Sequence, residues 1–254
     1  MQPRSQRERE HFDSIAADLG SVWWGSITAA GRVRLQERGE IAIRRARLGP
    51  GVKVLEPGAG NGEFTTRIAT SGATIVGIEI APRQQELATK MLAQFPNAQV
   101  VLGDVEERLA FADAYFECIV GNSVLHHLDL SRALPQLYRV LKPGGRVFFF
   151  EPNMLNPQIA LERNIRFIRR RMMNSPDETA FFRWKLRSTL GRHGFVKIDI
   201  RPFDFLHPGT PATLVPPIRA LSSALSSVPA VREVGGSLQI YAEKADAKPA
   251  SRGA

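Results

Sequence analysis

Two acidic residues and a cluster of glycines stand where two apolar, strand-like segments of this 254-residue chain end. Glu56 ends the first segment, Glu79 ends the second, and the glycines follow Glu56 as Gly58, Gly60 and Gly62. Glycine lets the backbone approach a ligand without a Cβ in the way, and a carboxylate at a strand end is suited to accept hydrogen bonds from ribose hydroxyls. A strand, a glycine turn, a helix and a second strand ending in an acid predict one nucleotide-binding half of a doubly wound α/β sheet.

The spacing of these glycines, and the acid in front of them, indicate which nucleotide the turn holds. The dinucleotide fingerprint is Gly-x-Gly-x-x-Gly, and its pyrophosphate rests on a helix N-terminus. Here the spacing is Gly-x-Gly-x-Gly, and the Glu56 carboxylate would repel a pyrophosphate but attract the amino group of a methionine moiety. The turn resembles motif I of the class I S-adenosylmethionine-dependent methyltransferases, in which an acid-x-Gly-x-Gly-x-Gly turn wraps the amino-acid end of the cofactor. The resemblance implies S-adenosyl-L-methionine as the cofactor.

Further residues follow in the expected order and extend the resemblance, which is close over residues 50–152. Glu79 matches the family's ribose-binding acid, and Asp104, after a third apolar segment, matches its adenine-contacting acid. Residues 122–128, Asn-Ser-Val-Leu-His-His-Leu, resemble the loop over the sulfonium in many small-molecule methyltransferases. The cofactor site that the resemblance implies consists of Glu56, Gly58, Gly60, Asn61, Gly62, Glu79, Ile80, Asp104, Val105, Asn122 and Ser123.

Two adjacent histidines in that loop are candidates for a catalytic base. A sulfonium is already an activated leaving group, so the protein must chiefly align the acceptor with the methyl–sulfur bond; a hydroxyl or carbon acid also needs a base. His126 is the first candidate and His127 the second, and the alternative for either is a helix cap or a packed, neutral imidazole. Glu151, at a neighbouring strand end, either orients an acceptor or, as we favour, caps local structure. Cys118 lies in an apolar strand and is expected to be a core residue, and no metal site is expected.

The apolar segments and the breaks between them predict one α/β domain with a doubly wound, seven-stranded, mostly parallel sheet. A final antiparallel hairpin of the sixth and seventh strands resembles the class I methyltransferase fold. Residues 1–49 are expected to form an N-terminal helical lid and residues 50–243 the cofactor-binding domain, with substrate-side insertions at about 155–175 and 205–235. Residues 244–254 are expected to be a disordered tail. The strands after the two at Glu56 and Glu79 are expected at 98–102, 116–121, 146–151, 195–203 and 237–242.

Local signals place several helices around this sheet. Helices predicted at 5–19 and 28–48 make up the lid, and Trp23-Trp24 between them either cover the ligand or anchor the lid to the core. A helix is predicted at 131–141 with the serine at its first position as N-cap. Ser175-Pro176-Asp177-Glu178 has the pattern of a capping box and predicts the start of a further helix.

An arginine-rich segment is predicted to form a basic amphipathic helix from Asn156-Pro157 onward, since proline suits the first helical position. Arg163, Arg166 and Arg170 fall opposite its apolar side, and Arg169 and Arg171 add to the cluster. Three readings remain open: a lid helix with a solvated face, a site for an anionic or lipid-like acceptor, and docking on an anionic membrane surface. The apolar side consists of Leu161, Ile165, Ile168 and Met172. A second apolar pattern, expected to line an acceptor pocket or to join the core, consists of Ile218, Leu221, Leu225 and Val228.

The charge of the chain is unevenly distributed. The net charge is +9, yet residues 51–150 hold nine Lys+Arg against ten Asp+Glu, whereas residues 151–254 hold sixteen against nine. The basic excess therefore belongs to the substrate side and not to the nucleotide-binding half. A single cysteine excludes an intrachain disulfide, and the sequence has no secretion-signal pattern and no run of about 18 apolar residues. We therefore expect a cytoplasmic protein.

These observations predict transfer of a methyl group from S-adenosylmethionine to a small-molecule acceptor. Methylation of RNA or protein is suggested only by the basic C-terminal third, and nucleic acid is disfavoured as a partner because residues 121–124 lack the Asn/Asp-Pro-Pro-aromatic signature of nucleobase amine methylation. Glu56 and the glycine spacing disfavour a nicotinamide-dependent dehydrogenase. The intact cofactor acids disfavour a non-catalytic cofactor-binding subunit. The sequence specifies neither the acceptor, the atom that is methylated, nor the oligomeric state.

Overall fold

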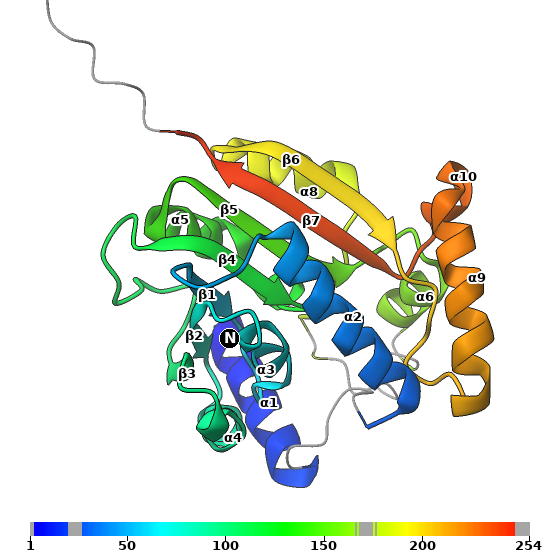
Figure 1. Cartoon of the computed structure of the whole chain (residues 1–254), viewed down its shortest axis with the longest axis horizontal. Coiled ribbons are helices and arrows are strands. Elements are labelled where there is room, and N and C mark those ends of the chain that lie inside the picture. Colours follow the sequence, from blue (N-terminus) through cyan, green and yellow to red (C-terminus); the bar gives the residue numbers. More distant parts are fainter. Residues whose placement is uncertain (1–2, 20–26, 166, 168–174, 176, 247–254) are drawn as a thin grey trace, which may run out of the picture.

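A seven-stranded sheet forms the centre of the molecule, in the order β3-β2-β1-β4-β5-β7-β6 (Figure 1). The computed structural model describes residues 3–19, 27–165, 167, 175 and 177–246. Strands β1 to β5 pair in parallel, and β7 runs antiparallel to both β5 and β6. This confirms the predicted fold class and its antiparallel end. The strands are β1 (Lys53–Pro57), β2 (Thr74–Glu79), β3 (Ala98–Leu102), β4 (Phe116–Asn122), β5 (Leu141–Pro152), β6 (Phe195–Phe203) and β7 (Ser237–Lys244).

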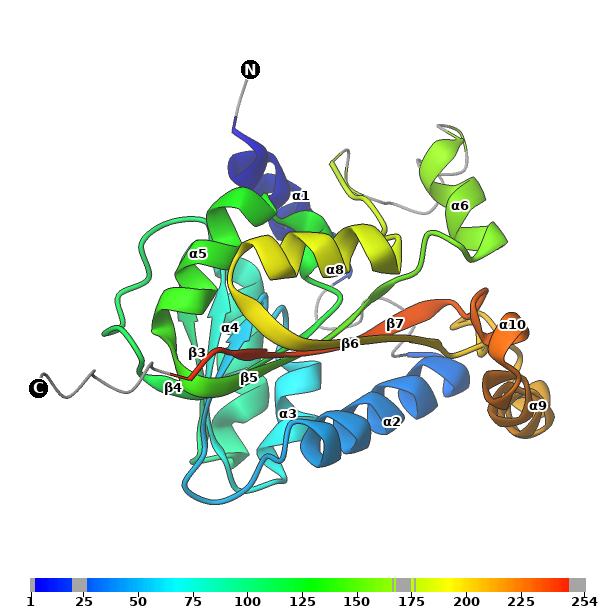
Figure 2. The ribbon, with the colours of Figure 1, turned by 90° about the horizontal axis from the view of Figure 1, so that it is seen from above.

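Helices cover both faces of the sheet, with α2 and α3 on one face and α5 and α8 on the other (Figure 2). Side chains therefore have to be apolar on both sides of the central strands. In β5, Phe149 joins the core on one face, and its neighbours Phe148 and Phe150 join the core on the other. The helices are α1 (Arg4–Leu19), α2 (Ala29–Arg45), α3 (Glu63–Ala69), α4 (Pro82–Met91), α5 (Leu130–Val140), α6 (Pro157–Asn164), α8 (Arg183–Arg192), α9 (Val215–Ser227) and α10 (Pro229–Arg232).

The ends of three helices differ from the sequence-based expectation. Asp129, not Ser131, is the N-cap of α5, because its side chain accepts the backbone N–H of Ser131. The expected capping box makes only a turn, in which Ser175 N donates to Glu178 Oε2 (3.1 Å), and α8 begins later, at Arg183. Helix α6 ends at Asn164, and the continuation predicted for it, with Ile168 and Met172, lies outside the described residues, as do Trp23 and Trp24.

The apolar side of α9 neither lines the cavity described below nor joins the core along its length. Val215 is buried and Ile218 packs near it, but Leu221 is 54% exposed and Val228 is 45% exposed. The predictions that this apolar side lines an acceptor pocket or joins the core are therefore wrong for its exposed part, at Leu221 and Val228. Cys118, by contrast, is fully buried, and burial raises the pKa of its thiol to about 12, which confirms a core role. In the described ranges, none of the helices has the length and apolar character that a membrane crossing requires.

Candidate active site

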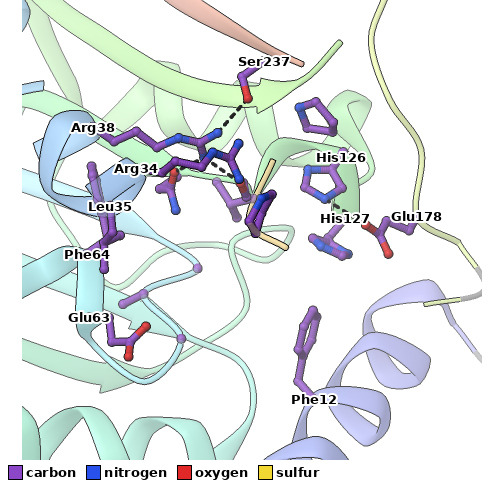
Figure 3. A pocket seen from close by; sticks show the side chains of 18 of the residues that line it. Phe12, Arg34, Leu35, Arg38, Glu63, Phe64, His126, His127, Glu178 and Ser237 are labelled. Atoms are coloured by element: carbon purple, nitrogen blue, oxygen red, sulfur yellow. Dashed lines mark hydrogen bonds and ion pairs between the residues drawn. The ribbon is translucent and has the colours of Figure 1, made fainter. Parts of the chain in front are cut away.

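A cavity of about 700 Å³ opens at the carboxyl ends of the parallel strands, the edge at which doubly wound sheets bind ligands. The strand ends supply one wall, and α1, α2, α6 and the segment 205–209 supply the rest. Figure 3 shows Arg34 and Arg38 of α2 reaching in from one side and the histidine pair, with Phe12, on the other. All the predicted cofactor residues line this cavity except Gly62.

The glycine turn after β1 has the backbone that its sequence requires. Gly58 and Gly60 have φ values of 62° and 55°, in the left-handed region that glycine adopts without strain. A Cβ on Gly58 would lie 2.4 Å from Val124 Cγ2, whereas a Cβ on Gly60 would meet nothing within 4 Å. Gly62 serves a different purpose, because it precedes α3 and a Cβ there would press on Ala88 of α4 at 3.2 Å. Packing therefore accounts for this glycine, and its ligand-binding role stays a prediction.

Glu79 connects the end of β2 to the glycine turn. Its Oε2 accepts the backbone N–H of Gly60 (2.8 Å), and its Oε1 accepts that of Ala81 (2.9 Å). The side chain is buried, and burial raises its pKa while these backbone donors oppose the rise. Two fixed hydrogen bonds hold the carboxylate rigidly at the cavity wall, as a site for paired hydroxyls requires.

Glu56 is a carboxylate without full hydrogen bonding. It is 1% exposed, and burial raises its pKa to about 8. Its Oε2 has no hydrogen-bond partner among the residues that the structure describes. Burying a carboxylate with one oxygen unpaired is costly, which is why the group holds its proton up to a pKa of about 8, and a cationic group in the cavity would stabilise its charged form. The residues present at this end of the cavity therefore fit the amino group of a methionine moiety.

The other predicted cofactor residues are held by their neighbours. Asp104 Oδ1 accepts the backbone N–H of Glu106 (2.8 Å), and Asn122 Oδ1 accepts from Arg38 Nη1 (2.7 Å). Ser123 has a φ of 59°, which is uncommon for a residue with a side chain. This conformation redirects the chain at the end of β4 and begins the histidine loop.

Arg38 is a buried cation in the cavity wall that sequence reasoning did not identify. It donates from Nη2 to Ser237 Oγ (2.6 Å) and lies 3.5 Å from Asp204 Oδ2, which also pairs with Arg34 (2.8 Å). Burial lowers the pKa of Arg38 to about 10, and the charge of Arg34 adds to this. Arg38 remains charged at neutral pH and joins α2 to β4 and β7 across the cavity.

His126 is enclosed by carboxylates. Its Nδ1 lies 2.6 Å from Glu151 Oε2, and its Nε2 lies 3.3 Å from Glu178 Oε1. Burial lowers the pKa of the ring, but the two carboxylates outweigh burial and raise it to about 9. Glu151 also accepts the backbone N–H groups of Val124 and Leu125 (2.9 and 2.7 Å). The prediction that Glu151 caps local structure is supported, and a charged His126 with both nitrogens engaged is unsuited to accept a proton.

His127 has the opposite character. Its Nδ1 lies 3.0 Å from Glu8 Oε2 of α1, and Phe12 packs edge-on against the ring. Burial, with the charge of His126, lowers its pKa. The ring is therefore neutral near pH 7, and when Nδ1–H donates to Glu8 its Nε2 is an acceptor. As an acceptor of a proton, His127 is therefore better suited than His126.

The segment 175–178 and α1 together close this end of the cavity. Glu8 Oε1 accepts from Ser175 Oγ (2.6 Å), and Arg7 pairs with Asp177 (2.7 Å). Arg163 of α6 pairs with Glu178, whose pKa falls to about 2 because His126 and Arg163 outweigh the effect of burial. In the described part of the chain, Nε and Nη1 of Arg163 have no hydrogen-bond partner.

His126, His127 and Glu178 also bring ligand-type atoms within 4.8 Å of one another. Such a set is able to hold a transition metal ion. Here, however, Arg163 pairs with the same Glu178 oxygen that faces His126. The observed arrangement is a chain of alternating charges, in which the guanidinium competes with any cation for that oxygen.

The cavity-lining side chains that sequence reasoning missed are Glu8, Arg38 and Glu178. Glu178 was noticed only as part of a capping box, whereas Arg163 belongs to the cluster for which an anionic acceptor was one open reading. Each acts through a partner far away in sequence, such as His127 for Glu8 and Asn122 for Arg38. The only local pattern that pointed to one of them was the serine-to-glutamate spacing of Ser175 and Glu178. It indicated an ordered turn, but not that the Glu178 side chain faces His126.

Comparison with known proteins agrees with this geometry. The sequence profile of a family described as "Methyltransferase domain" matches residues 55–149. The chain carries a methyltransferase domain. The match begins in β1 and ends in β5, so the domain includes the glycine turn, Glu79, Asp104 and both histidines. Together with the sheet order, it assigns the domain to the class I methyltransferases.

Relatives of the domain include proteins with and without a described activity. An uncharacterized methyltransferase of Mycobacterium tuberculosis is 34% identical over 95 residues, which cover 37% of this chain and 37% of that protein. A ubiquinone/menaquinone biosynthesis C-methyltransferase of Geotalea daltonii is 29% identical over 154 residues, covering 58% of this chain and 64% of that protein. The alignments therefore cover less than two thirds of the length of these curated relatives.

A solved structure shows the same fold over a longer stretch. The geranyl diphosphate C-methyltransferase of Streptomyces coelicolor A3(2), in complex with Mg²⁺, geranyl diphosphate and S-adenosyl-L-homocysteine, superposes with a TM-score of 0.63 at 13% identity. The superposition covers 96% of this chain and 98% of that one. Glu8, Arg38, Arg163 and Glu178 lie outside the segment that matches the methyltransferase family, although they line the same cavity.

Proposed function

We propose that this chain transfers a methyl group from S-adenosyl-L-methionine to a small-molecule acceptor. The observation that carries the proposal is the buried carboxylate of Glu56, unpaired at one oxygen, beside the glycine turn of a methyltransferase domain. The cofactor's amino group would neutralise it, Glu79 would receive the ribose hydroxyls and Asp104 would face the adenine. When bound, the cofactor supplies an already activated methyl group. A solved neighbour of this fold holds S-adenosyl-L-homocysteine, which supports the assignment.

The acceptor end of the cavity suits removal of a proton. His127 would accept it at Nε2, and Glu8, on the opposite nitrogen, would fix the ring and stabilise the charge that forms. His126 would act as a positioning residue, because its bonds to Glu151 and Glu178 hold the loop that carries His127. An acceptor with an acidic O–H or C–H group is the class that needs such a base.

The cation in this wall suggests a second property of the acceptor. Arg163 lines the cavity, its side chain is 10% exposed, and two of its nitrogens lack partners among the described residues. A negative or partly negative oxygen on the acceptor would satisfy these donors. An anionic or lipid-like small molecule with an ionisable group fits the wall best.

Calorimetric titration tests the cofactor assignment. S-adenosyl-L-homocysteine is expected to bind and NADH is not; binding of NADH alone would overturn the proposal. Formation of S-adenosyl-L-homocysteine from S-adenosyl-L-methionine, screened with phenols, enols and β-dicarbonyl compounds, then tests methyl transfer. Turnover with RNA or protein but with no small molecule would favour the rival substrate classes. Cofactor binding without turnover on any of these substrates would favour a non-catalytic subunit.

A further inference from the structure

One buried serine contacts a carboxylate partner of each of the two histidines. Ser175 is 1% exposed and is not among the residues that line the cavity. Its Oγ donates to Glu8 Oε1 (2.6 Å), and its backbone N–H donates to Glu178 Oε2 (3.1 Å). Glu8 pairs with His127, and Glu178 is one of the two carboxylates beside His126 (Figure 3). Ser175 therefore connects the surroundings of one ring to those of the other.

The hydrogen bond from the Ser175 hydroxyl has a defined direction. A carboxylate offers only lone pairs, so the hydroxyl donates its proton to Glu8 and accepts none from it. A distance of 2.6 Å is typical of a hydroxyl bound to a charged acceptor, the stronger kind of hydrogen bond. A carboxylate held at one oxygen cannot turn about its terminal bond without losing that hydrogen bond. Oε2 therefore remains the oxygen of Glu8 that faces Nδ1 of His127, 3.0 Å away.

The Glu8 carboxylate depends on this serine for its orientation. It is 4% exposed, and in the part of the chain that the structure describes it has two hydrogen-bond partners, Ser175 and His127. Without the serine hydroxyl, Oε1 would be buried and unpaired, which costs free energy. The carboxylate would lower this cost by turning or by moving toward water. In either case its contact with His127 would change.

The orientation of Glu8 in turn decides which nitrogen of His127 carries the proton. A neutral imidazole has one N–H, and the partner of that N–H determines which nitrogen is left as an acceptor. With Nδ1–H directed at Glu8, Nε2 is free to accept. In the other tautomer, Nδ1 would face the carboxylate with lone pair against lone pair. The other charges near the ring belong to His126 and Glu178, and in the described structure neither is hydrogen-bonded to it.

We propose that Ser175 is a positioning residue: its hydroxyl orients Glu8, and Glu8 holds His127 in the tautomer whose Nε2 is free to take the acceptor's proton. The effect on turnover rests on the proposed function, whereas the hydrogen bonds and the tautomer do not. Because Ser175 does not line the cavity, it would affect the reaction only through Glu8.

NMR spectra of the full chain with ¹⁵N-labelled histidine test the proposal without any substrate. At about pH 8, where an ordinary imidazole is neutral, wild-type His127 is expected to carry its proton on Nδ1. His127→Gln assigns the signal. Ser175→Ala is expected to place about a tenth or more of the rings in the Nε2–H form, whereas Ser175→Thr keeps the hydroxyl and the wild-type tautomer. Ser131→Ala is the matched control, since Ser131 Oγ also donates to a carboxylate, that of Asp129, at 2.6 Å but is exposed.

Two further measurements make the outcome decisive. Titration with S-adenosyl-L-homocysteine establishes that each variant is folded; if Ser175→Ala is not, Ser175→Cys, with a weaker donor, replaces it. Once an acceptor is identified, Ser175→Ala should lower kcat by about three- to tenfold and leave KM for the acceptor within about twofold, and Ser175→Thr should restore kcat.

Three results separate this proposal from the proposed function. A wild-type His127 protonated at Nε2 would overturn the positioning role of Ser175. So would a Ser175→Ala variant with the wild-type tautomer. The expected change of tautomer in a chain that transfers no methyl group would support the role of Ser175 in orienting Glu8 and would count against the proposed function alone.

Discussion

The two walls of the cavity are built in different ways. The wall proposed for the cofactor comes from the segment that matches the methyltransferase family, and it uses glycine backbone, strand ends and single buried acids such as Glu56 and Glu79. The wall proposed for the acceptor combines that segment's histidine loop with α1, α6 and residues 175–178, and it uses contacts between side chains far apart in the sequence, such as the hydrogen bond of Glu8 with His127. One wall is thus specified by local pattern and the other by tertiary packing. The methyl donor is accordingly readable from short motifs, whereas the acceptor is not.

The largest expected effect is on kcat and comes from replacing His127 in the wall proposed for the acceptor. His127→Ala is expected to lower kcat by about 100-fold or more, the range for loss of a general base, and to leave the affinity for S-adenosyl-L-homocysteine unchanged. Glu8→Gln should also lower kcat, by about tenfold, because it removes the charge that stabilises the protonated ring. Both are measured as formation of S-adenosyl-L-homocysteine with an acceptor identified by the screen. Because the pKa of His127 is lowered, the wild-type rate should decline only as the pH falls below about 6.5.

His193→Ala, at the C-cap of α8 and outside the cavity, is the control for histidine replacement. Full activity of His127→Ala, or an equal loss in the control, would remove His127 from the role of base.

The second effect belongs to the cofactor wall. Glu56→Gln keeps the shape of the side chain but removes the negative charge, and a hydrogen bond to a charged group contributes about 1.5–3 kcal/mol. The dissociation constant of S-adenosyl-L-homocysteine should therefore rise by about 10- to 100-fold. Glu162→Gln, on α6 at the acceptor wall, should leave it unchanged. If Glu56→Gln and Glu162→Gln bound S-adenosyl-L-homocysteine equally well, the proposal that the wall with Glu56 binds the cofactor would be contradicted.

The third effect is on the free energy of unfolding. It comes from His126, which lies between the carboxylates of Glu151 and Glu178. The folded-state pKa of His126 is raised to about 9 from an ordinary value of 6.5. Its contribution is therefore fully present below pH 6.5 and is lost as the pH rises through 9. The free energy of unfolding is expected to fall by about 2–3 kcal/mol over this window, as measured by urea titration at each pH.

His126→Gln should flatten this dependence, and His193→Gln should not. If the His126 variant does not fold, the slope is measured in Glu56→Gln, because Glu56 loses a proton in the same window. Equal stability of that variant at pH 6.5 and pH 9 contradicts the charged state of His126.

The smallest expected effect concerns metal ions. Arg163 pairs with the Glu178 oxygen that a shared cation would need, so dialysis against EDTA is expected to leave turnover and Tm unchanged. Loss of activity on chelation, restored by added Zn²⁺ or Mn²⁺, would instead show that His126, His127 and Glu178 hold a metal.

The predictability of the two walls from sequence differs for a physical reason. The seven strands, the glycine turn and Glu79 were predictable because apolar runs, glycine spacing and strand-end acids are properties of neighbouring residues. The direction of the Glu178 side chain was not, since the same serine-to-glutamate spacing suits a helix start and an isolated turn. The order of the two histidines was also inaccessible, because burial and the carboxylates of Glu151, Glu178 and Glu8 set their pKa values.

Proton release on cofactor binding tests the central claim most directly. The pKa of Glu56 is raised to about 8 in the free protein, so the carboxyl group is mostly protonated at pH 7, and a bound amino group would drive it to the charged form. Titration of S-adenosyl-L-homocysteine at pH 7, in two buffers with different ionisation enthalpies, should therefore show release of close to one proton, which Glu56→Gln abolishes. Binding without proton release, or release that persists in Glu56→Gln, would contradict the account.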